Sequence, residues 1–301
     1  MSGACTTTLD RVMPVECDAR VIANRSVVPE GAILTLAAGE PFPAPNAGQF
    51  VHVRLCGEGP LLRRPFSVLG YSPEPRGARL ELMYAVVGTG TALLARLAPG
   101  DRVNLLGPLG NHFALGGARR LVLVAGGRGA VPLYRLIESG EANGREVVFL
   151  FGARSSEYLW GLERLAGVAH RLATIDGSTG IKGTVIDLLT AELESCASAG
   201  FEAVRVFACG PEIMLRRVAE TAAALGVESQ VALENQMGCA IGVCRGCVIP
   251  RRRREGTPWP RDGNARYATV CKEGPVFFGD DVDWEAMAHA EATVPRGNQT
   301  L

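Results

Sequence analysis

Four cysteines near the C-terminus have the spacing of iron–sulfur ligands: Cys239, Cys244, Cys247 and Cys271. The first three follow the pattern C-x4-C-x2-C, and the fourth comes after a gap of 23 residues. This is the plant-type pattern for a 2Fe–2S cluster, and it predicts one-electron chemistry. A structural zinc loop is the alternative, although tetrahedral zinc sites prefer two C-x2-C pairs and only Cys244 and Cys247 form one.

The other cysteines bear on where the protein works. Cys5, Cys17, Cys56, Cys196 and Cys209 are scattered along the chain, which has nine cysteines in all. The N-terminal segment lacks the apolar core of a secretion signal. We therefore expect a reduced cytoplasmic setting, where clustered cysteines serve metals or redox chemistry rather than disulfides.

A glycine-rich turn, AGGRGAVPL, follows an apolar strand in the middle of the chain. Gly126, Gly127 and Gly129 would let backbone N–H groups face a pyrophosphate, with the N-terminal dipole of the next helix behind them. A glycine cluster alone is weak support for nucleotide binding. Its place between a strand and a helix strengthens the prediction.

Two later turns close strands of the same region. Cys209, Gly210 and Pro211 follow one apolar strand, and Asp176 begins the turn after another. Ligands of open parallel sheets bind outside the carboxyl ends of the strands, so we expect the first turn to line the nucleotide crevice. For Asp176 and the two residues after it, a plain β–α turn explains the residues as well as ligand contact does.

The N-terminal third contains a segment that suits a flavin dinucleotide. In LLRRPFSV, Arg64 precedes an aromatic residue and Ser67. A guanidinium group binds phosphate oxygens in bidentate fashion, and a serine hydroxyl can hydrogen-bond the polar edge of the isoalloxazine ring. On spacing alone, a solvated pair is the simpler interpretation of Arg63 and Arg64. The later segment VVGTGT supplies glycines and hydroxyls ahead of a helical stretch, a geometry available for anion binding.

Composition and hydrophobic patterning predict the strands and helices that position these residues. Apolar residues make up 47% of the 301 residues, and 31 basic side chains balance 31 acidic ones, so we expect buried cores and neither a nucleic-acid nor a membrane partner. Short alternating runs between residues 16 and 110 predict an antiparallel barrel or sandwich. After residue 116, apolar strands alternate with helical stretches, which indicates a doubly wound parallel sheet. We divide the chain at 14–115, 116–231 and 232–301.

Together these motifs identify a family. A barrel with R-P-F-S and G-T-G-T, followed by L-G-P-L-G-N, G-G-x-G-x-x-P-L, D-G-S-x-G and C-G-P, resembles the ferredoxin-NADP reductase-like superfamily. Within it, the segments LENQMGCAIGVCRGC and VCKEGPVF are similar to the electron-transfer subunits of class 1B dihydroorotate dehydrogenases. The resemblance runs in the family's order from about residue 16 to residue 278.

The resemblance implies an antiparallel β-barrel that binds FAD, an α/β parallel-sheet domain that binds NAD, and a small C-terminal 2Fe–2S domain. It also implies an FMN-containing dihydroorotate dehydrogenase catalytic subunit as partner, in a hetero-tetramer of pyrimidine biosynthesis. No general acid or base is needed for hydride transfer, so we assign no catalytic side chain. The cofactor-binding positions carried over are Arg64, Pro65, Phe66, Ser67, Met83, Tyr84, Ala85, Gly90, Thr91, Gly126, Gly127, Gly129, Asp176, Cys209, Gly210 and Pro211, and the cluster ligands are the four cysteines.

The chain departs from the family pattern at four places. Arg128 stands in the glycine loop where an apolar residue is usual, and Ala85 replaces a position that is often basic. His112 interrupts a common GN-G-F sequence. The gap before Cys271 is longer than usual and carries Arg251–Arg254, Pro258, Trp259 and Pro260, which suit either solvated surface or a docking site for an acidic partner.

Three functional hypotheses remain at this stage. The favoured one is the NAD-linked electron-transfer subunit, although Arg154 and the serines after it would also suit the 2′-phosphate of NADP. The second couples the same cofactors to another acceptor, such as ferredoxin, a sulfur-reducing subunit or an oxygenase. The third is a zinc-bearing binding module without flavin. The four histidines, His52, His112, His170 and His289, are expected to be structural or on the surface.

Overall fold

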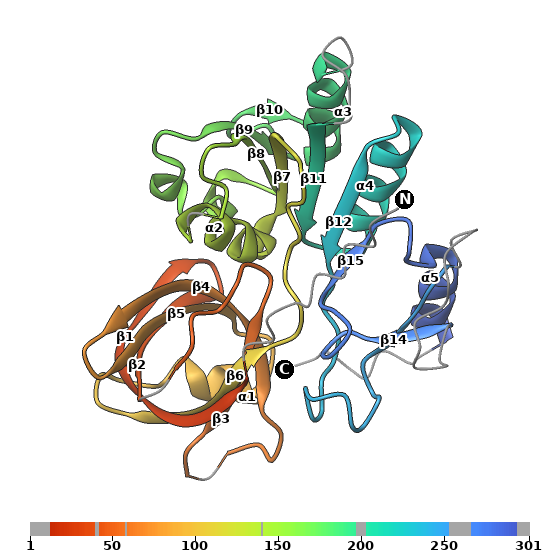
Figure 1. The fold of residues 1–301 in the computed structure, drawn as a ribbon. Coiled ribbons are helices and arrows are strands. Elements are labelled where there is room, and N and C mark those ends of the chain that lie inside the picture. Colours follow the sequence, from red (N-terminus) through yellow and green to blue (C-terminus); the bar gives the residue numbers. More distant parts are fainter. Residues whose placement is uncertain are drawn as a thin grey trace, which may run out of the picture.

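The computed structural model describes residues 13–39, 42–57, 59–139, 141–196, 203–252 and 266–293. For residues 289–293 it describes the backbone only. Cys5, Arg253, Arg254, the Pro258–Pro260 segment and the side chain of His289 lie outside these residues, so their predicted roles stay predictions. The chain forms a barrel, a helix-covered sheet and a smaller C-terminal part beside both (Figure 1).

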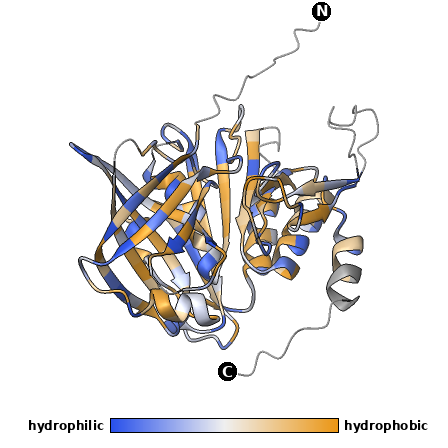
Figure 2. Cartoon of the chain, turned by 90° about the horizontal axis from the view of Figure 1, so that it is seen from below, coloured by the Kyte–Doolittle hydropathy of each residue, from blue (hydrophilic) through white to orange (hydrophobic). Residues whose placement is uncertain are grey.

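Six antiparallel strands form the closed barrel, in the order β1-β2-β5-β4-β3-β6. Hydrophilic and hydrophobic residues alternate along these strands (Figure 2), because one face of each strand packs in the barrel interior. The helix α1 (Thr89–Leu94) follows β5. The six strands confirm the predicted barrel, and their bounds are β1 Val15–Val28, β2 Gly31–Ala38, β3 Phe50–Leu55, β4 Arg64–Glu74, β5 Gly77–Ala85 and β6 Arg102–Leu109.

The second layer is a seven-stranded sheet in the order β10-β9-β8-β7-β11-β12-β15. All its strands are parallel except β15, so the predicted parallel sheet is confirmed. The strand order reverses between β7 and β11, which makes their carboxyl ends the switch point where ligands bind. The bounds are β7 Arg120–Gly126, β8 Glu146–Ala153, β9 Ala169–Thr174, β10 Ile181–Lys182, β11 Val204–Cys209, β12 Glu228–Ala232 and β15 Val276–Phe278.

Helices cover both faces of this sheet, as the apolar run in β7 requires. Leu121 and Leu123 pack in the core that contains the helix α2 (Ala130–Glu138), whereas Val122 and Val124 pack on the opposite face, in the core of α3 (Val185–Cys196) and α4 (Glu212–Ala224). A strand buried on both faces has no polar side, so its sequence is continuously apolar. The short helices η1 (Gly127–Gly129), η2 (Ser156–Tyr158) and η3 (Leu162–Leu165) lie in loops of this layer.

The C-terminal part is joined to the sheet more closely than predicted. The boundary proposed at 231/232 falls inside β12, and β15 returns from the C-terminal part to pair with that strand. The antiparallel β15 fills an edge that would otherwise expose unpaired backbone groups of β12. The rest of this part comprises β13 (Val248–Pro250), β14 (Tyr267–Thr269) and α5 (Trp284–Thr293).

The arginine pair of the barrel is not a solvated pair. Arg63 donates hydrogen bonds to Asn104 Oδ1 at 2.5 Å and Glu16 Oε1 at 2.7 Å, and its side chain is only 14% exposed. It also donates to the backbone carbonyls of His52 and Asn104. Arg63 therefore joins β1, β3 and β6, whereas its neighbour Arg64 turns away toward α1.

His52 is a buried titratable group in the barrel. It is 1% exposed, and neither ring nitrogen has a hydrogen-bond partner. Desolvation, followed by the positive charge of Arg63, lowers the pKa of His52 from 6.5 to about 4. The neutral imidazole is therefore the form that the folded barrel accepts.

This burial predicts a pH-dependent loss of stability. His52 has a lower pKa in the folded than in the unfolded chain, so its contribution is complete above pH 6.5 and is lost as the pH falls toward 4. We compare the decrease in unfolding free energy when the pH is lowered from 7.5 to 5. This decrease should be smaller in His52→Leu than in the wild type, by on the order of 1 kcal/mol. Urea unfolding at both pH values measures this. The exposed His170→Leu should behave as wild type, and equal slopes in all three proteins would refute the assignment.

Candidate functional site

Two turns meet at the switch point of the sheet, where backbone packs on backbone. A Cβ atom placed on Gly129 would lie 2.2 Å from the carbonyl oxygen of Cys209, and one on Gly210 would lie 3.1 Å from the Cα of Gly126. Gly127 has a φ of 55° and open space around it. The glycines predicted for a nucleotide loop and the Cys209–Pro211 turn are thus brought together, as expected.

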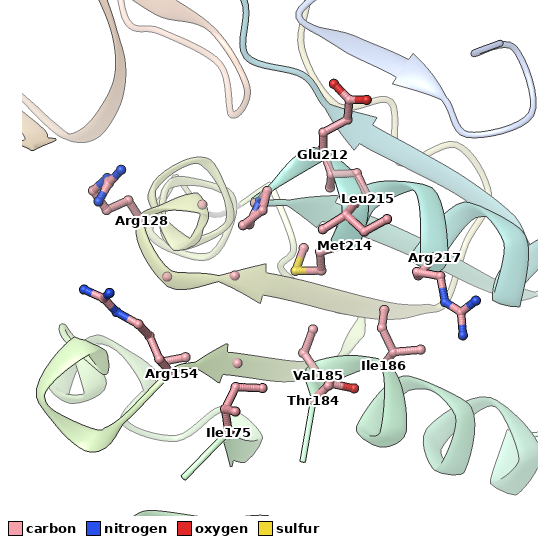
Figure 3. Close-up of a pocket in the computed structure, with 18 of the residues that line it drawn as sticks. Arg128, Arg154, Ile175, Thr184, Val185, Ile186, Glu212, Met214, Leu215 and Arg217 are labelled. Atoms are coloured by element: carbon pink, nitrogen blue, oxygen red, sulfur yellow. The ribbon is translucent and has the colours of Figure 1, made fainter. Parts of the chain in front are cut away.

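A cavity of about 1100 Å³ opens at this place and extends between α3 and α4. Gly126, Gly127, Gly129, Gly210 and Pro211 line it, together with the N-terminal turns of α3 and α4. We call this space the nucleotide cavity. Figure 3 shows Arg128 and Arg154 at one end of it and Arg217 at the other. Its length and its glycine-lined floor suit an extended dinucleotide, with arginines available to the phosphates.

Asp176 is not among the residues lining this cavity; its neighbour Ile175 is. The Asp176 carboxylate accepts hydrogen bonds from the hydroxyl of Ser178 at 2.7 Å and its N–H at 3.0 Å, and these bonds lower the pKa of Asp176. The Ser178 hydroxyl in turn accepts a bond from the N–H of Ser156 at 2.8 Å. Asp176 thus shapes the turn and joins the segments that follow β8 and β9. This is the role that a plain β–α turn gives it.

A second cavity, of about 230 Å³, lies between the barrel and the sheet. It contains the predicted flavin residues Pro65, Phe66, Ser67, Met83, Tyr84, Ala85 and Thr91, and we call it the flavin cavity. Phe66 and Tyr84 pack edge to face with ring centroids 6.2 Å apart. The Tyr84 hydroxyl donates to Asn24, whose amide holds the Leu94 carbonyl at 2.9 Å, so this wall is tied to α1.

Arg64 and Gly90 belong to the same site although neither lines the cavity. A Cβ atom on Gly90 would lie 2.2 Å from the Nε atom of Arg64, so the guanidinium lies directly on the glycine at the start of α1. The Thr91 hydroxyl accepts hydrogen bonds from the N–H groups of Val87 and Gly88, at 2.9 and 3.2 Å, and thereby shapes this turn. The segments RPFS and GTGT therefore contact each other through Arg64 and Gly90.

Sequence reasoning did not name Glu234 or Leu233, which with Arg128 line both cavities. The Glu234 side chain is open to the cavities, but protein surrounds it on its other sides, and this desolvation raises its pKa against the opposing charge of Arg128. Burial, and then the charge of Glu234, raise the pKa of Cys209. The Cys209 thiol is therefore neutral, and the Glu234 carboxyl group and the Arg128 guanidinium group lie together at the passage between the cavities.

The four predicted cluster cysteines lie in two pairs. Cys239 interacts with Cys244 near the surface, and Cys271 interacts with Cys247 in the interior. Among the described residues, no three Cys, His, Asp or Glu side chains converge as a single metal ion requires. A 2Fe–2S cluster instead has two irons, so the paired arrangement fits it.

Backbone N–H groups point at these sulfurs, as a cluster site requires. Gly242 donates to the Cys271 sulfur at 3.2 Å and Cys244 to the Cys239 sulfur at 3.4 Å. Burial opposes ionisation of Cys239, but donors led by the Cys244 N–H lower its pKa to about 6. Burial, followed by Cys247, raises the pKa of Cys271 to about 12, so an iron that bound there would have to displace the proton of this thiol.

Comparison with known proteins agrees with this geometry. Residues 234–283 match the model for the iron-sulfur cluster binding domain of dihydroorotate dehydrogenase B. The chain is 36% identical over 275 residues to the electron transfer subunit of dihydroorotate dehydrogenase B (NAD(+)) from Desulforamulus reducens, covering 89% of this chain and 98% of that one. This chain belongs to that family. The subunit from Bacillus caldolyticus is 38% identical, with 78% of this chain and 86% of its own covered.

Solved structures share the family's fold. The NADH-dependent reduced ferredoxin-NADP oxidoreductase studied for electron bifurcation superposes with a TM-score of 0.75 at 24% identity, covering 92% of this chain and 94% of that one. A ferredoxin NADP+ reductase from Neisseria gonorrhoeae gives 0.60 at 20% identity, over 70% and 92% of the two chains. The barrel and parallel sheet of this family member therefore have the same fold as in these two reductases.

The contact between the two turns predicts the effect of one methyl group. In Gly129→Ala the new Cβ would meet backbone atoms of Cys209 and Gly210 at 2.2 to 2.5 Å, so the turns must separate. We expect a loss of about 1–3 kcal/mol in unfolding free energy and weaker dinucleotide binding. Denaturant unfolding and a fluorescence titration with NADH measure these. Gly117→Ala has open space and should change neither; an unchanged Gly129→Ala would contradict the packing.

Proposed function

We propose that this chain passes electrons between NAD(H) and a partner flavoprotein through a bound FAD and a 2Fe–2S cluster. One observation carries the proposal: the flavin cavity has walls from all three parts of the chain. The barrel supplies Pro65–Ser67, the glycine turns supply Arg128 and Cys209, and the cysteine-bearing part supplies Met237 and Pro275. A group bound there touches the nucleotide cavity on one side and segments leading to the cysteines on the other.

This placement agrees with the chemistry of the three cofactors. A bound flavin supplies exchange of two electrons with a nicotinamide and of single electrons with an iron–sulfur cluster, so the middle position suits it. Pro65, Phe66 and Ser67 would bind its ring, with Arg64 at its phosphates. Gly126, Gly127 and Gly129 would hold the dinucleotide pyrophosphate, and the Cys209–Pro211 turn would support the nicotinamide.

The passage between the cavities would orient the reacting rings. The neutral Cys209 thiol and the apolar Leu233 line it. Glu234 presents a carboxyl group where the nicotinamide ring would lie, and Arg128 presents a guanidinium group beside the glycine loop. We assign these groups to binding and orientation, because hydride transfer needs no general acid or base.

The partner we propose is the FMN-containing catalytic subunit of dihydroorotate dehydrogenase, joined in a hetero-tetramer that serves pyrimidine biosynthesis in the cytoplasm. The names of the family relatives support this. The cysteine loop also suits a docking surface, because Ile241 and Val243 are 49% and 76% exposed beside Cys244. None of the helices in the described ranges has the length and apolar content needed to cross a bilayer.

The complex predicts a defined activity. Co-expression with the catalytic subunit should give a complex that contains flavin and 2Fe–2S absorbance bands and reduces NAD with dihydroorotate. NADH should be preferred over NADPH, because NAD is the nucleotide named for the family. A colourless, zinc-containing protein would refute the cofactor assignment. Electron transfer to ferredoxin or an oxygenase, without dihydroorotate activity, would refute only the partner.

Flavin binding predicts a role for one arginine. Arg64→Ala removes a guanidinium that lies against Gly90, and a charge-assisted hydrogen bond is worth about 1.5–3 kcal/mol. We expect FAD affinity to fall by roughly 10- to 150-fold, measured by flavin titration into flavin-free protein. Arg79→Ala, which removes an exposed partner of Glu74, is the matched control. Equal FAD affinity in both variants would exclude Arg64 from the site.

A further inference from the structure

The linker between the barrel and the sheet holds the chain segment that follows Cys271. The Asn111 amide nitrogen donates to the carbonyls of Glu273 at 2.8 Å and Val276 at 2.7 Å, and its amide oxygen accepts from the Val276 N–H at 2.8 Å. The backbone N–H of Asn111 donates to the Gly274 carbonyl at 2.7 Å. One residue therefore binds a four-residue segment through four hydrogen bonds.

This segment connects the two redox sites. It begins two residues after Cys271 and contains Pro275, which lines the flavin cavity. The turn that carries Cys271 is closed internally, because the Thr269 carbonyl accepts from Glu273 and Gly274 N–H groups at 3.0 and 3.2 Å. The Glu273 carboxylate also accepts from the Thr269 N–H at 2.6 Å. Hydrogen bonds thus make the turn that carries Cys271 and the segment that contains Pro275 one connected piece.

The backbone at the end of the barrel packs closely against the segment that contains Gly274 and Pro275. A Cβ atom on Gly110 would lie 2.6 Å from the Pro275 ring and 2.8 Å from the Gly274 carbonyl oxygen. Gly110 also has a φ of 76°, which favours glycine. Asn111, the next residue, fixes the piece in this contact by hydrogen bonds whose lengths leave little freedom.

We propose that Asn111 is a positioning residue that sets the separation between the Cys247–Cys271 pair and the flavin cavity. The inference rests on the proposed function, because it gives the separation a consequence for electron transfer. The rate of electron transfer falls steeply with separation. In other enzymes a misplacement of about 1 Å caused by a remote mutation can cost on the order of 10²-fold.

A matched control is available on the same linker. The amide of Gln230, on β12, donates to the Ala114 carbonyl at 2.7 Å and accepts from the Ala114 N–H at 2.9 Å. Gln230 is buried, so Gln230→Ala should cost stability. It contacts the sheet side of the linker and not the turn that carries Cys271.

The first test examines the positioning without any cofactor. In cofactor-free protein, Asn111→Ala removes the acceptor of the Val276 N–H, so hydrogen exchange at Val276 and in residues 269–276 should quicken at least tenfold. Gln230→Ala should leave exchange in that segment as in the wild type. Unchanged exchange in Asn111→Ala would overturn the proposal, whatever cofactors the protein binds.

The second test measures electron transfer in the full complex loaded with FAD and cluster. Asn111→Asp keeps the acceptor oxygen but loses both donors to the carbonyls of Glu273 and Val276. After mixing with NADH in stopped flow, bleaching of the cluster bands should slow by at least tenfold. Flavin reduction should change by less than threefold. Gln230→Ala should change neither step beyond threefold.

The outcomes separate the two proposals. If the wild-type protein binds no flavin or cluster, the proposed function fails, while the exchange test still decides the positioning role. If Asn111→Asp and Gln230→Ala slow the cluster step equally, Asn111 acts only through stability and the inference is overturned. Should Asn111→Asp fail to fold, Asn111→Ser, which keeps one donor, replaces it and should show a smaller slowing in the cluster step; wild-type rates in Asn111→Ser would overturn the inference.

Discussion

The contact between the glycine loop and the end of β11 is the constraint on which the arrangement of sites depends. Because the order of strands reverses between β7 and β11, their carboxyl ends diverge into a crevice, and Gly129 and Gly210 bring the two turns together at its base. A larger side chain at Gly129 would force these turns apart. The same turns also supply Arg128 and Cys209 to the flavin cavity, so one contact shapes both binding spaces.

The cysteine-bearing part is held by two separate attachments. β15 pairs with β12 and makes the C-terminal part continuous with the sheet, while Asn111 ties it to the end of the barrel. A part attached at one point could rotate about it. Attachment at the sheet edge and at the barrel removes that freedom. It also places Met237, just before the first cluster cysteine, and Pro275, just after the last one, at the flavin cavity.

Most of the fold followed from sequence patterns, and the exceptions have physical causes. The continuous apolar run of β7 predicted a sheet covered on both faces, and the alternating barrel strands predicted a sheet buried on one face. A strand buried on both faces is apolar throughout, whereas a strand buried on one face alternates apolar and polar residues. The predicted domain boundary at 231/232 did not take into account the pairing of β12 with β15, which joins residues more than forty positions apart and which no local pattern reveals. Arg63 was misjudged because spacing shows a charge but not Asn104 and Glu16, its distant partners.

The candidate site shows the same division between local and distant information. Glycines and cysteines were found from spacing, because close backbone approach and metal ligation require particular residue types in a short segment. Glu234 lies in the LEN segment that carried the family resemblance, but its role depends on a passage that only folding creates. There its carboxyl group and the Arg128 guanidinium group lie at the junction of the two cavities. Desolvation raises the pKa of Glu234 and the charge of Arg128 opposes this, so a pyrophosphate that drew Arg128 away would raise that pKa further. The departure at Arg128 thus bears on the protonation of Glu234 at the junction of the two cavities.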